Sequence, residues 1–192
     1  MSSFDAARLV GAMALGLSVG GCFQPLYGQA SHPGLVEDMR AIEVAEIGPQ
    51  IDKVIKPNAI GISADVDRID RIAHYLRNDL IFNLNGTGTS PPLKYRLTVT
   101  TKETTTTPTV ESQEGVADAA TLTVSAKYIL TPYGGGAPII SNEAVSSAVY
   151  DISFNHFGNL RAARDAEIRL AKSLADEMEL RIAAALAEKQ GS

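Results

Sequence analysis

The residue with the most distinctive chemistry is Cys22, the only cysteine in the sequence. It follows an uncharged, mostly apolar run over residues 9–19 and the two small residues Gly20 and Gly21. This run is shorter than the roughly 20 residues that a membrane-spanning helix needs, and its length is typical of the core of a secretory signal peptide. The pattern predicts that residues 1–21 form a lipoprotein signal peptide and that the thiol of Cys22 is the lipid attachment site.

A lone cysteine fits this prediction, because an exported thiol without a second cysteine cannot form an internal disulfide. Each buried lipid CH2 contributes about 0.8 kcal/mol, so several acyl chains of the palmitate kind on one residue anchor a protein stably. Phe23, rather than an aspartate, follows Cys22, and in many bacteria this leaves a lipoprotein free to reach the outer membrane. We therefore expect a lipid-anchored protein on the periplasmic side of the outer membrane. The alternative is a free cysteine behind a signal peptide that is cleaved elsewhere.

Other residue types that support catalysis or metal binding do not form a recognisable set. The three histidines lie far apart and none has a neighbour at metal-ligand spacing: His32, His74 and His156. Acidic residues stand four positions before arginines, as in Asp67–Arg71 and Asp165–Arg169, which is typical of a solvated helix face. We expect no catalytic residue, no metal and no cofactor other than a covalent lipid on Cys22, and therefore a protein that is not an enzyme.

Charge separates the possible partners. The net charge of −5 argues against a nucleic-acid partner. Positive side chains nevertheless gather on the wet face of two predicted strands: Lys94, Arg96, Lys102 and Lys127. One interpretation is that they keep an exposed sheet soluble and protect its edge. The other is that Lys94, Arg96 and Lys127 contact anionic phosphates of a lipid headgroup.

The spacing of apolar residues predicts the strands and helices that position these residues. Alternation of apolar and polar residues predicts strands over 40–47, 93–100, 121–130 and 144–154, the last with the weakest apolar stripe. Apolar residues at helical spacing predict one helix that begins at Asp65 or Asp67 and ends at Asn85–Gly86.

A second, longer helix is predicted over residues 160–189, which contain no Pro or Gly. Its apolar stripe is expected to include Ile168, Leu174, Met178 and Ile182. Residues 132–138 are predicted to form a hairpin turn, Gly48–Pro49 to stop the first strand, and residues 104–108 to form a polar connection.

These elements predict an α+β fold, a two-layer sandwich in the order β-α-β-β-β-α. A four-stranded, mostly antiparallel sheet would carry two helices packed on one face, because the long C-terminal helix needs a surface to lie on. The predicted organisation is a signal peptide over 1–21, a lipidated tether over 22–38, rich in Gly, Pro, Ser and Gln, and one folded domain over 39–192.

Several segments together resemble LptE, the lipopolysaccharide-assembly lipoprotein family, in its alphaproteobacterial form. Cys22 with Phe23–Gly28 resembles the start of the mature family members, although a glycine that commonly precedes the aromatic residue is missing. The segment Ala126–Leu130 resembles the central strand of the family. Tyr150–Ala163, continuing through Arg164–Glu167 to Leu174–Ala175, resembles the entry into its C-terminal helix.

The resemblance implies a non-catalytic protein that plugs the LptD outer-membrane β-barrel, assists its assembly and binds lipopolysaccharide on its way to the outer leaflet. Only Cys22 carries over from the family's functional residues, so Lys94, Arg96 and Lys127 remain candidates from strand geometry. Two other functions stay open. The chain could be an auxiliary lipoprotein of an ABC-type lipid-transport system, or a periplasmic hydrolase with an unrecognised site.

Overall fold

The computed structural model describes residues 34–49, 62–86, 91–106 and 119–191. The chain divides into two units, Met1–Val36 and Glu37–Ser192, and the second contains the sheet and both long helices. The predicted signal peptide, Cys22 and most of the predicted tether lie outside the described residues. Helix α2 (Leu35–Arg40) begins before the predicted start of the folded domain at residue 39.

A mixed sheet forms one layer of the second unit. Its strands are β1 (Ile42–Val44), β2 (Gly48–Pro49), β3 (Tyr95–Thr106), β4 (Ala119–Pro132) and β5 (Ile140–Asp151). The spatial order is β1-β3-β4-β5, and β2 also pairs with β3. The three long strands run antiparallel to one another, β3 beside β4 and β4 beside β5, whereas β1 and β2 run parallel to β3.

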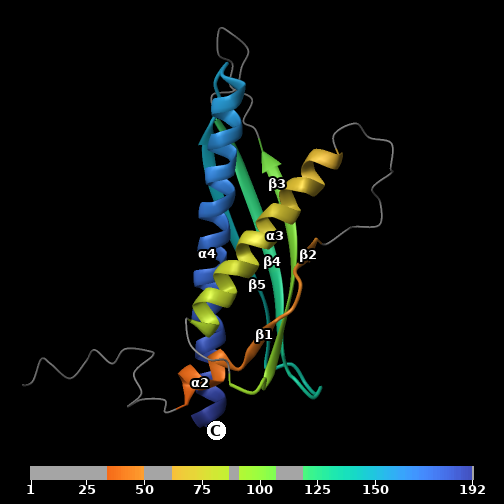
Figure 1. Ribbon diagram of the computed structural model, residues 1–192, viewed down its shortest axis with the longest axis vertical. Coiled ribbons are helices and arrows are strands. Elements are labelled where there is room, and N and C mark those ends of the chain that lie inside the picture. Colours follow the sequence, from red (N-terminus) through yellow and green to blue (C-terminus); the bar gives the residue numbers. More distant parts are fainter. Residues whose placement is uncertain (1–33, 50–61, 87–90, 107–118, 192) are drawn as a thin grey trace, which may run out of the picture. The chain divides into compact units, whose positions relative to one another are not determined.

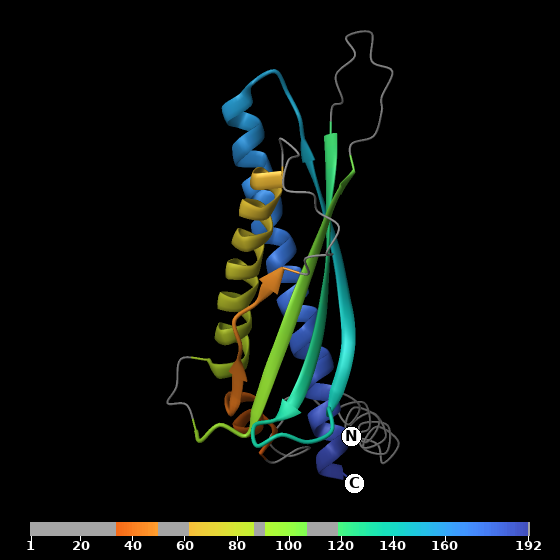
Figure 2. The same cartoon turned by 90° about the vertical axis from the view of Figure 1, so that its right-hand side faces the viewer.

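Two helices, α3 (Ile62–Asn85) and α4 (His156–Gly191), form the other layer and lie on the same side of the sheet (Figure 1, Figure 2). Both bury an apolar stripe, formed in α4 by residues such as Leu170, Leu174, Met178 and Ile182. The predicted α+β sandwich and its order β-α-β-β-β-α are therefore confirmed, with short α2 and β2 as additions. No helix within the described ranges is both long and apolar enough to cross a membrane.

Alternation along the strands sends one set of side chains into the core. On β3 and β4 this set includes Leu97, Val99, Leu122, Val124 and Leu130, all nearly inaccessible to solvent. The β5 stripe is weaker, as predicted, because its fully buried members are small. This weak stripe lies under α4, where small side chains let the helix approach the strand.

Several boundaries differ from the predictions. Helix α3 begins at Ile62, before Asp65 and Asp67, and β3 continues through Thr106 where a polar connection was expected. Threonine is β-branched and pairs readily across strands, so a threonine run extends a strand as easily as it forms a loop. Gly48–Pro49 does not end the pairing, because it forms the parallel bridge β2 beside Thr100 and Thr101.

Two predictions for the last third of the chain were also wrong in detail. Helix α4 begins at His156, because Asn155 caps it by accepting a hydrogen bond from the backbone N–H of Gly158 at 3.1 Å. Ile168 was expected in the buried stripe, yet it is exposed. The predicted hairpin turn is confirmed, and Gly135 and Gly136 supply the positive φ angles that it needs.

Candidate functional site

The face of the sheet that points away from α3 and α4 is the surface on which the basic candidates were predicted (Figure 2). Hydroxyl side chains dominate this open face, with a few charged and apolar residues among them. Within the described residues no helix packs on it. Its members are Arg96, Thr98, Thr100, Lys102, Thr104 and Thr106 of β3, Thr121, Thr123, Ser125, Lys127, Ile129 and Thr131 of β4, and Ser141, Glu143, Val145, Ser147 and Val149 of β5.

Lys94 precedes β3 and is paired with a carboxylate. Its Nζ donates a hydrogen bond to Oδ1 of Asp38 at 2.7 Å, and Oδ2 of Asp38 accepts one from Gln190 of α4 at 2.8 Å. The hydrogen bond and charge of Asp38 raise the pKa of Lys94. Lys94 therefore links β3 to α2 and to the end of α4, and its charge is neutralised locally.

Arg96 lies on the open face and is also paired. Its Nε donates to Oε2 of Glu43 at 2.7 Å, because Glu43 on β1 is its register partner. The guanidinium carbon also lies 5.1 Å from the centre of the Tyr133 ring. The hydrogen bond and charge of Glu43 raise the pKa of Arg96, so the side chain is charged at all ordinary pH values. The guanidinium is therefore held between Glu43 and Tyr133.

Lys127 is the most accessible of the three candidates. It is exposed, and within the described residues it has no ion pair or hydrogen bond. Its register partners are Thr100 on β3 and Glu143 on β5. Arg96 lies opposite Thr131, four residues further along β4, so the two cations stand about 13 Å apart along the strand. The structure thus places Arg96 and Lys127 on one face without joining them into a single compact site.

An ionic cluster that the sequence analysis missed lies between the two helices and β3. Glu167 of α4 is buried, and its carboxylate accepts two hydrogen bonds from Arg71 of α3, at 2.8 and 3.1 Å. Arg68 donates to Glu103 at 2.7 Å and to Thr105 at 3.0 Å, and its Nε lies 3.9 Å from Glu167. This cluster fastens α3 to α4 and to the sheet, which is a structural role.

The sequence contains a signal for this cluster. Glu167 stands three, four and seven positions before Leu170, Ala171 and Leu174, so helical spacing places it on the buried stripe. A buried carboxylate requires a charged partner. The partner, Arg71, could not be chosen from sequence because it lies 96 positions away.

The outer edge of β5 is partly closed by arginines of α4. Arg169 donates to the carbonyl oxygen of Val149 at 3.2 Å, and Arg181 donates to that of Glu143 at 3.1 Å. Arg169 also holds the exposed carboxylate of Asp165 at 2.7 Å, as predicted from their spacing. These contacts occupy backbone acceptors that an unprotected edge strand would offer to another chain.

A polar cavity of about 760 Å³ lies beside α3. Its lining residues come from α3 and from the chain around β2: Glu46, Ile47, Gly48, Asp70, Ala73, His74 and Arg77. His74 is exposed, and its Nε2 lies 3.2 Å from the amide nitrogen of Asn78. In the described part of the chain no three His, Cys, Asp or Glu side chains are arranged to hold a metal ion. The open face therefore remains the leading candidate surface.

Comparisons with known proteins bear on the fold alone. No protein-family model and no curated protein sequence matches the chain. Among solved structures, a Caulobacter crescentus CB15 protein provisionally described as a lipoprotein is similar with a TM-score of 0.55 and 21% identity, over 81% of this chain and 97% of its own. The rare lipoprotein B of Shewanella oneidensis matches at a TM-score of 0.46 and 10% identity, over 77% of this chain and 99% of its own. The first of these shares the fold.

Proposed function

We propose that this protein is a non-catalytic outer-membrane lipoprotein that plugs and assists the assembly of an LptD-type β-barrel, the translocon that inserts lipopolysaccharide into the outer leaflet. The observation that carries the proposal is the open face. A hydroxyl-rich sheet face that no helix covers in the described part of the chain suits a domain enclosed by the polar inner wall of a barrel. The resemblance of Cys22 through Gly28 to LptE supports the same function.

Binding of lipopolysaccharide is the second part of the proposal. Lys127 is the cation on the open face whose ammonium group is available to a phosphate. Hydroxyl groups of Thr100 and Ser125 beside it can donate hydrogen bonds to phosphate or sugar oxygens. Lys94 and Arg96, which already face carboxylates, would contribute less unless the ligand displaces those partners.

The first experiment is a mild-detergent pull-down of the tagged, full-length protein from outer membranes, with mass spectrometry of the co-purified proteins. A stoichiometric large β-barrel of the LptD type is the expected result. Recovery of an ABC-transport component instead would favour the auxiliary-lipoprotein function, and absence of any partner would contradict the plug. Hydrolytic activity of the purified protein would revive the third alternative.

Lipopolysaccharide contact is tested separately with Lys127→Gln, which removes the charge without creating a like-charge pair with Glu143. We expect its affinity for lipid A to fall about tenfold, the effect of losing about 1.4 kcal/mol from one charge-assisted contact. The matched control is Lys172→Gln, which removes an exposed lysine from α4 on the opposite layer. Equal affinities of the two variants would exclude Lys127 as a ligand contact and leave the pull-down result standing.

A further inference from the structure

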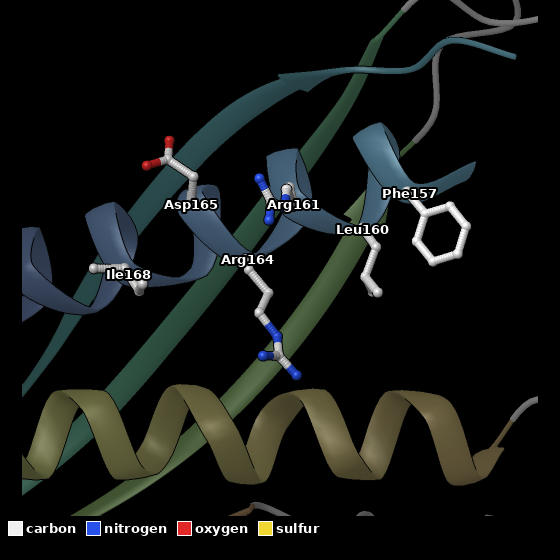
Figure 3. Close-up of a pocket in the computed structure, with 6 residues that line it drawn as sticks. All are labelled: Phe157, Leu160, Arg161, Arg164, Asp165 and Ile168. Carbon is white, nitrogen blue, oxygen red and sulfur yellow. The ribbon is translucent and has the colours of Figure 1, made fainter. Parts of the chain in front are cut away.

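Large apolar side chains are exposed in the first turns of α4 and just before them. Phe154 is 81% exposed, Phe157 79%, Leu160 54% and Ile168 47%. Phe157, Leu160 and Ile168 line a shallow cavity of about 450 Å³ together with Arg161, Arg164 and Asp165, as Figure 3 shows. We call Phe154 and these six lining residues the α4 tip. Contiguous exposed apolar side chains of this kind mark an interaction surface.

The tip is held in place by hydrogen bonds. Asn155 caps the helix, and the side chain of Asn159 accepts hydrogen bonds from the backbone N–H and the hydroxyl of Ser153 at 2.8 and 3.2 Å. The amide of Asn159 donates in turn to the carbonyl oxygen of Ser153 at 2.7 Å. Phe154 and Phe157, on either side of this cap, are therefore presented to solvent by an ordered backbone.

Charge distinguishes the tip from the rest of the molecule. Arg161 and Arg164 are exposed and make no ion pair or hydrogen bond within the described residues. Two nearby acids are paired, Asp165 with Arg169 and Glu167 with Arg71, while the exposed Asp151 ends β5 outside the tip. The tip itself carries two arginines against one carboxylate. The tip is therefore net positive in a chain whose net charge is −5.

Arginine and apolar side chains share one helix face here. Positions 157, 160, 161, 164 and 168 follow helical spacing, so the side chains project together. Phe and Leu insert at the boundary between headgroups and acyl chains, while Arg reaches the phosphates, which is the pattern of interfacial membrane-binding helices. We propose that the α4 tip docks on the surface of an anionic lipid bilayer.

This contact goes beyond the proposed function, because no residue of the tip belongs to the open face. The tip also lies far from the end where the folded unit begins. The last residues of α4 lie near the start of the folded unit, because Gln190 bonds to Asp38. The ammonium of Lys189 also lies 5.2 Å from the ring centre of Tyr95, which pairs with Ile42 of β1. With 36 residues, α4 is about 54 Å long, and the tip is at its other end. Docking there would be a second membrane contact besides a lipid on Cys22.

A fluorescent reporter tests the tip directly, because the chain contains no tryptophan. The Phe157→Trp variant of the full-length, lipidated protein is reconstituted into phosphatidylcholine vesicles with and without phosphatidylglycerol. Brominated lipids then report whether the indole reaches the bilayer. The matched control is Phe82→Trp, which replaces an exposed phenylalanine in the last turn of α3, beside Asn83, whose side chain bonds to Asp176 in the middle of α4.

We expect at least a twofold quenching of the Phe157→Trp emission and a blue shift in vesicles with phosphatidylglycerol, and neither in neutral vesicles or for Phe82→Trp. Adding Arg161→Gln and Arg164→Gln to Phe157→Trp should abolish the quenching. The proposal is overturned if the two reporters are quenched equally, if neither responds, or if neutral vesicles quench Phe157→Trp as strongly. If neither reporter responds, the tip would instead be a surface for a protein partner. If neutral vesicles quench as strongly, the tip would insert its apolar side chains without recognising anionic headgroups. Because every variant carries the same lipid, none of these outcomes depends on the translocon function.

Discussion

At the scale of single residues, the buried carboxylate of Glu167 ties two helices together. It is 1% exposed, and it holds the guanidinium of Arg71 with two hydrogen bonds. A buried charge is tolerated when it is paired and hydrogen-bonded, and loss of one partner leaves the other uncompensated. The contribution of the Glu167–Arg71 pair to the free energy of unfolding is therefore measured by removing one partner.

Replacing Glu167 by Ala should lower the free energy of unfolding by about 3 kcal/mol, the lower end of the range for broken buried pairs, because Arg71 retains some contact with water. Urea unfolding followed by circular dichroism measures the loss. Asp165→Ala is the control, since it breaks an exposed pair on the same helix and should cost less than about 1 kcal/mol. Similar losses for the two variants would show that Glu167 is not part of a buried pair in solution.

Asp79 responds to pH in the opposite sense from most carboxylates. Partial burial raises its pKa, Lys172 lowers it and Asp176 raises it, and the net shift is upward. Its ionised form is therefore disfavoured in the folded state at neutral pH, and this penalty disappears as the pH falls below the pKa of an unfolded aspartate. Asp79→Asn should stabilise the protein at pH 7, by less than about 1 kcal/mol, and have no stabilising effect near pH 3.

Thermal melting at several pH values tests this expectation. Asp151→Asn, which removes the same charge at an exposed position at the end of β5, serves as the comparison variant. A gain for Asp79→Asn that persisted at pH 3 would contradict an ionisation effect.

At the scale of elements, α4 contributes the largest continuous share of the core. Leu174 lies in the middle of its buried stripe and is inaccessible to solvent. Leu174→Ala should lower the free energy of unfolding by about 2–5 kcal/mol, because it removes buried methyl groups and leaves a cavity. Leu180→Ala, at an exposed position on the same helix, should change it by less than about 0.5 kcal/mol. Chemical denaturation with both variants measures the difference, and equal effects would mean that α4 packs on another face.

Periodicity was sufficient to predict these elements, because each amphipathic face carries its own signal. The pairs Leu97 and Val99, and Leu122 and Val124, alternate with polar residues and proved buried. Element boundaries were less predictable, because a run of threonines can form either a strand or a loop, and an asparagine can either cap a helix or lie in a turn. The threonines after Lys102 became strand only because β4 lies beside them, which is a tertiary effect.

The candidate site was predictable only in part, for a related physical reason. Strand alternation correctly placed Arg96 and Lys127 on the exposed face. It could not show that Glu43 of β1 lies opposite Arg96 or that Asp38 reaches Lys94, because these pairs are 53 and 56 positions apart. The tip of α4 was missed because Phe154 was assigned to the stripe of the last strand, whereas β5 ends at Asp151.

At the scale of the whole molecule, we expect the covalent lipid to set the location and the folded domain to be independent of it. Cys22→Ala should move the protein from the membrane to the soluble fraction in a detergent-free fractionation with a high-salt wash. The wash is needed because salt screens any contact between Arg161, Arg164 and anionic headgroups. The melting temperature should not change. Ser18→Ala, which keeps the thiol, is the control, and retention of Cys22→Ala in washed membranes would contradict the anchor.

The position of α4 in the chain has a consequence for biogenesis. Every strand precedes it, so the apolar face of the sheet has no long helix beside β5 until the last residues of the domain are available. Helix α3 lies between β1 and β3 in the sequence, so the parallel pairing of these two strands joins residues that are far apart along the chain. During export, an incomplete chain would therefore expose Leu122, Val124 and Leu130 to other chains. A holding chaperone that shields extended apolar strands should prolong the lifetime of this intermediate, and truncation before α4 should turn it into a substrate for proteolysis.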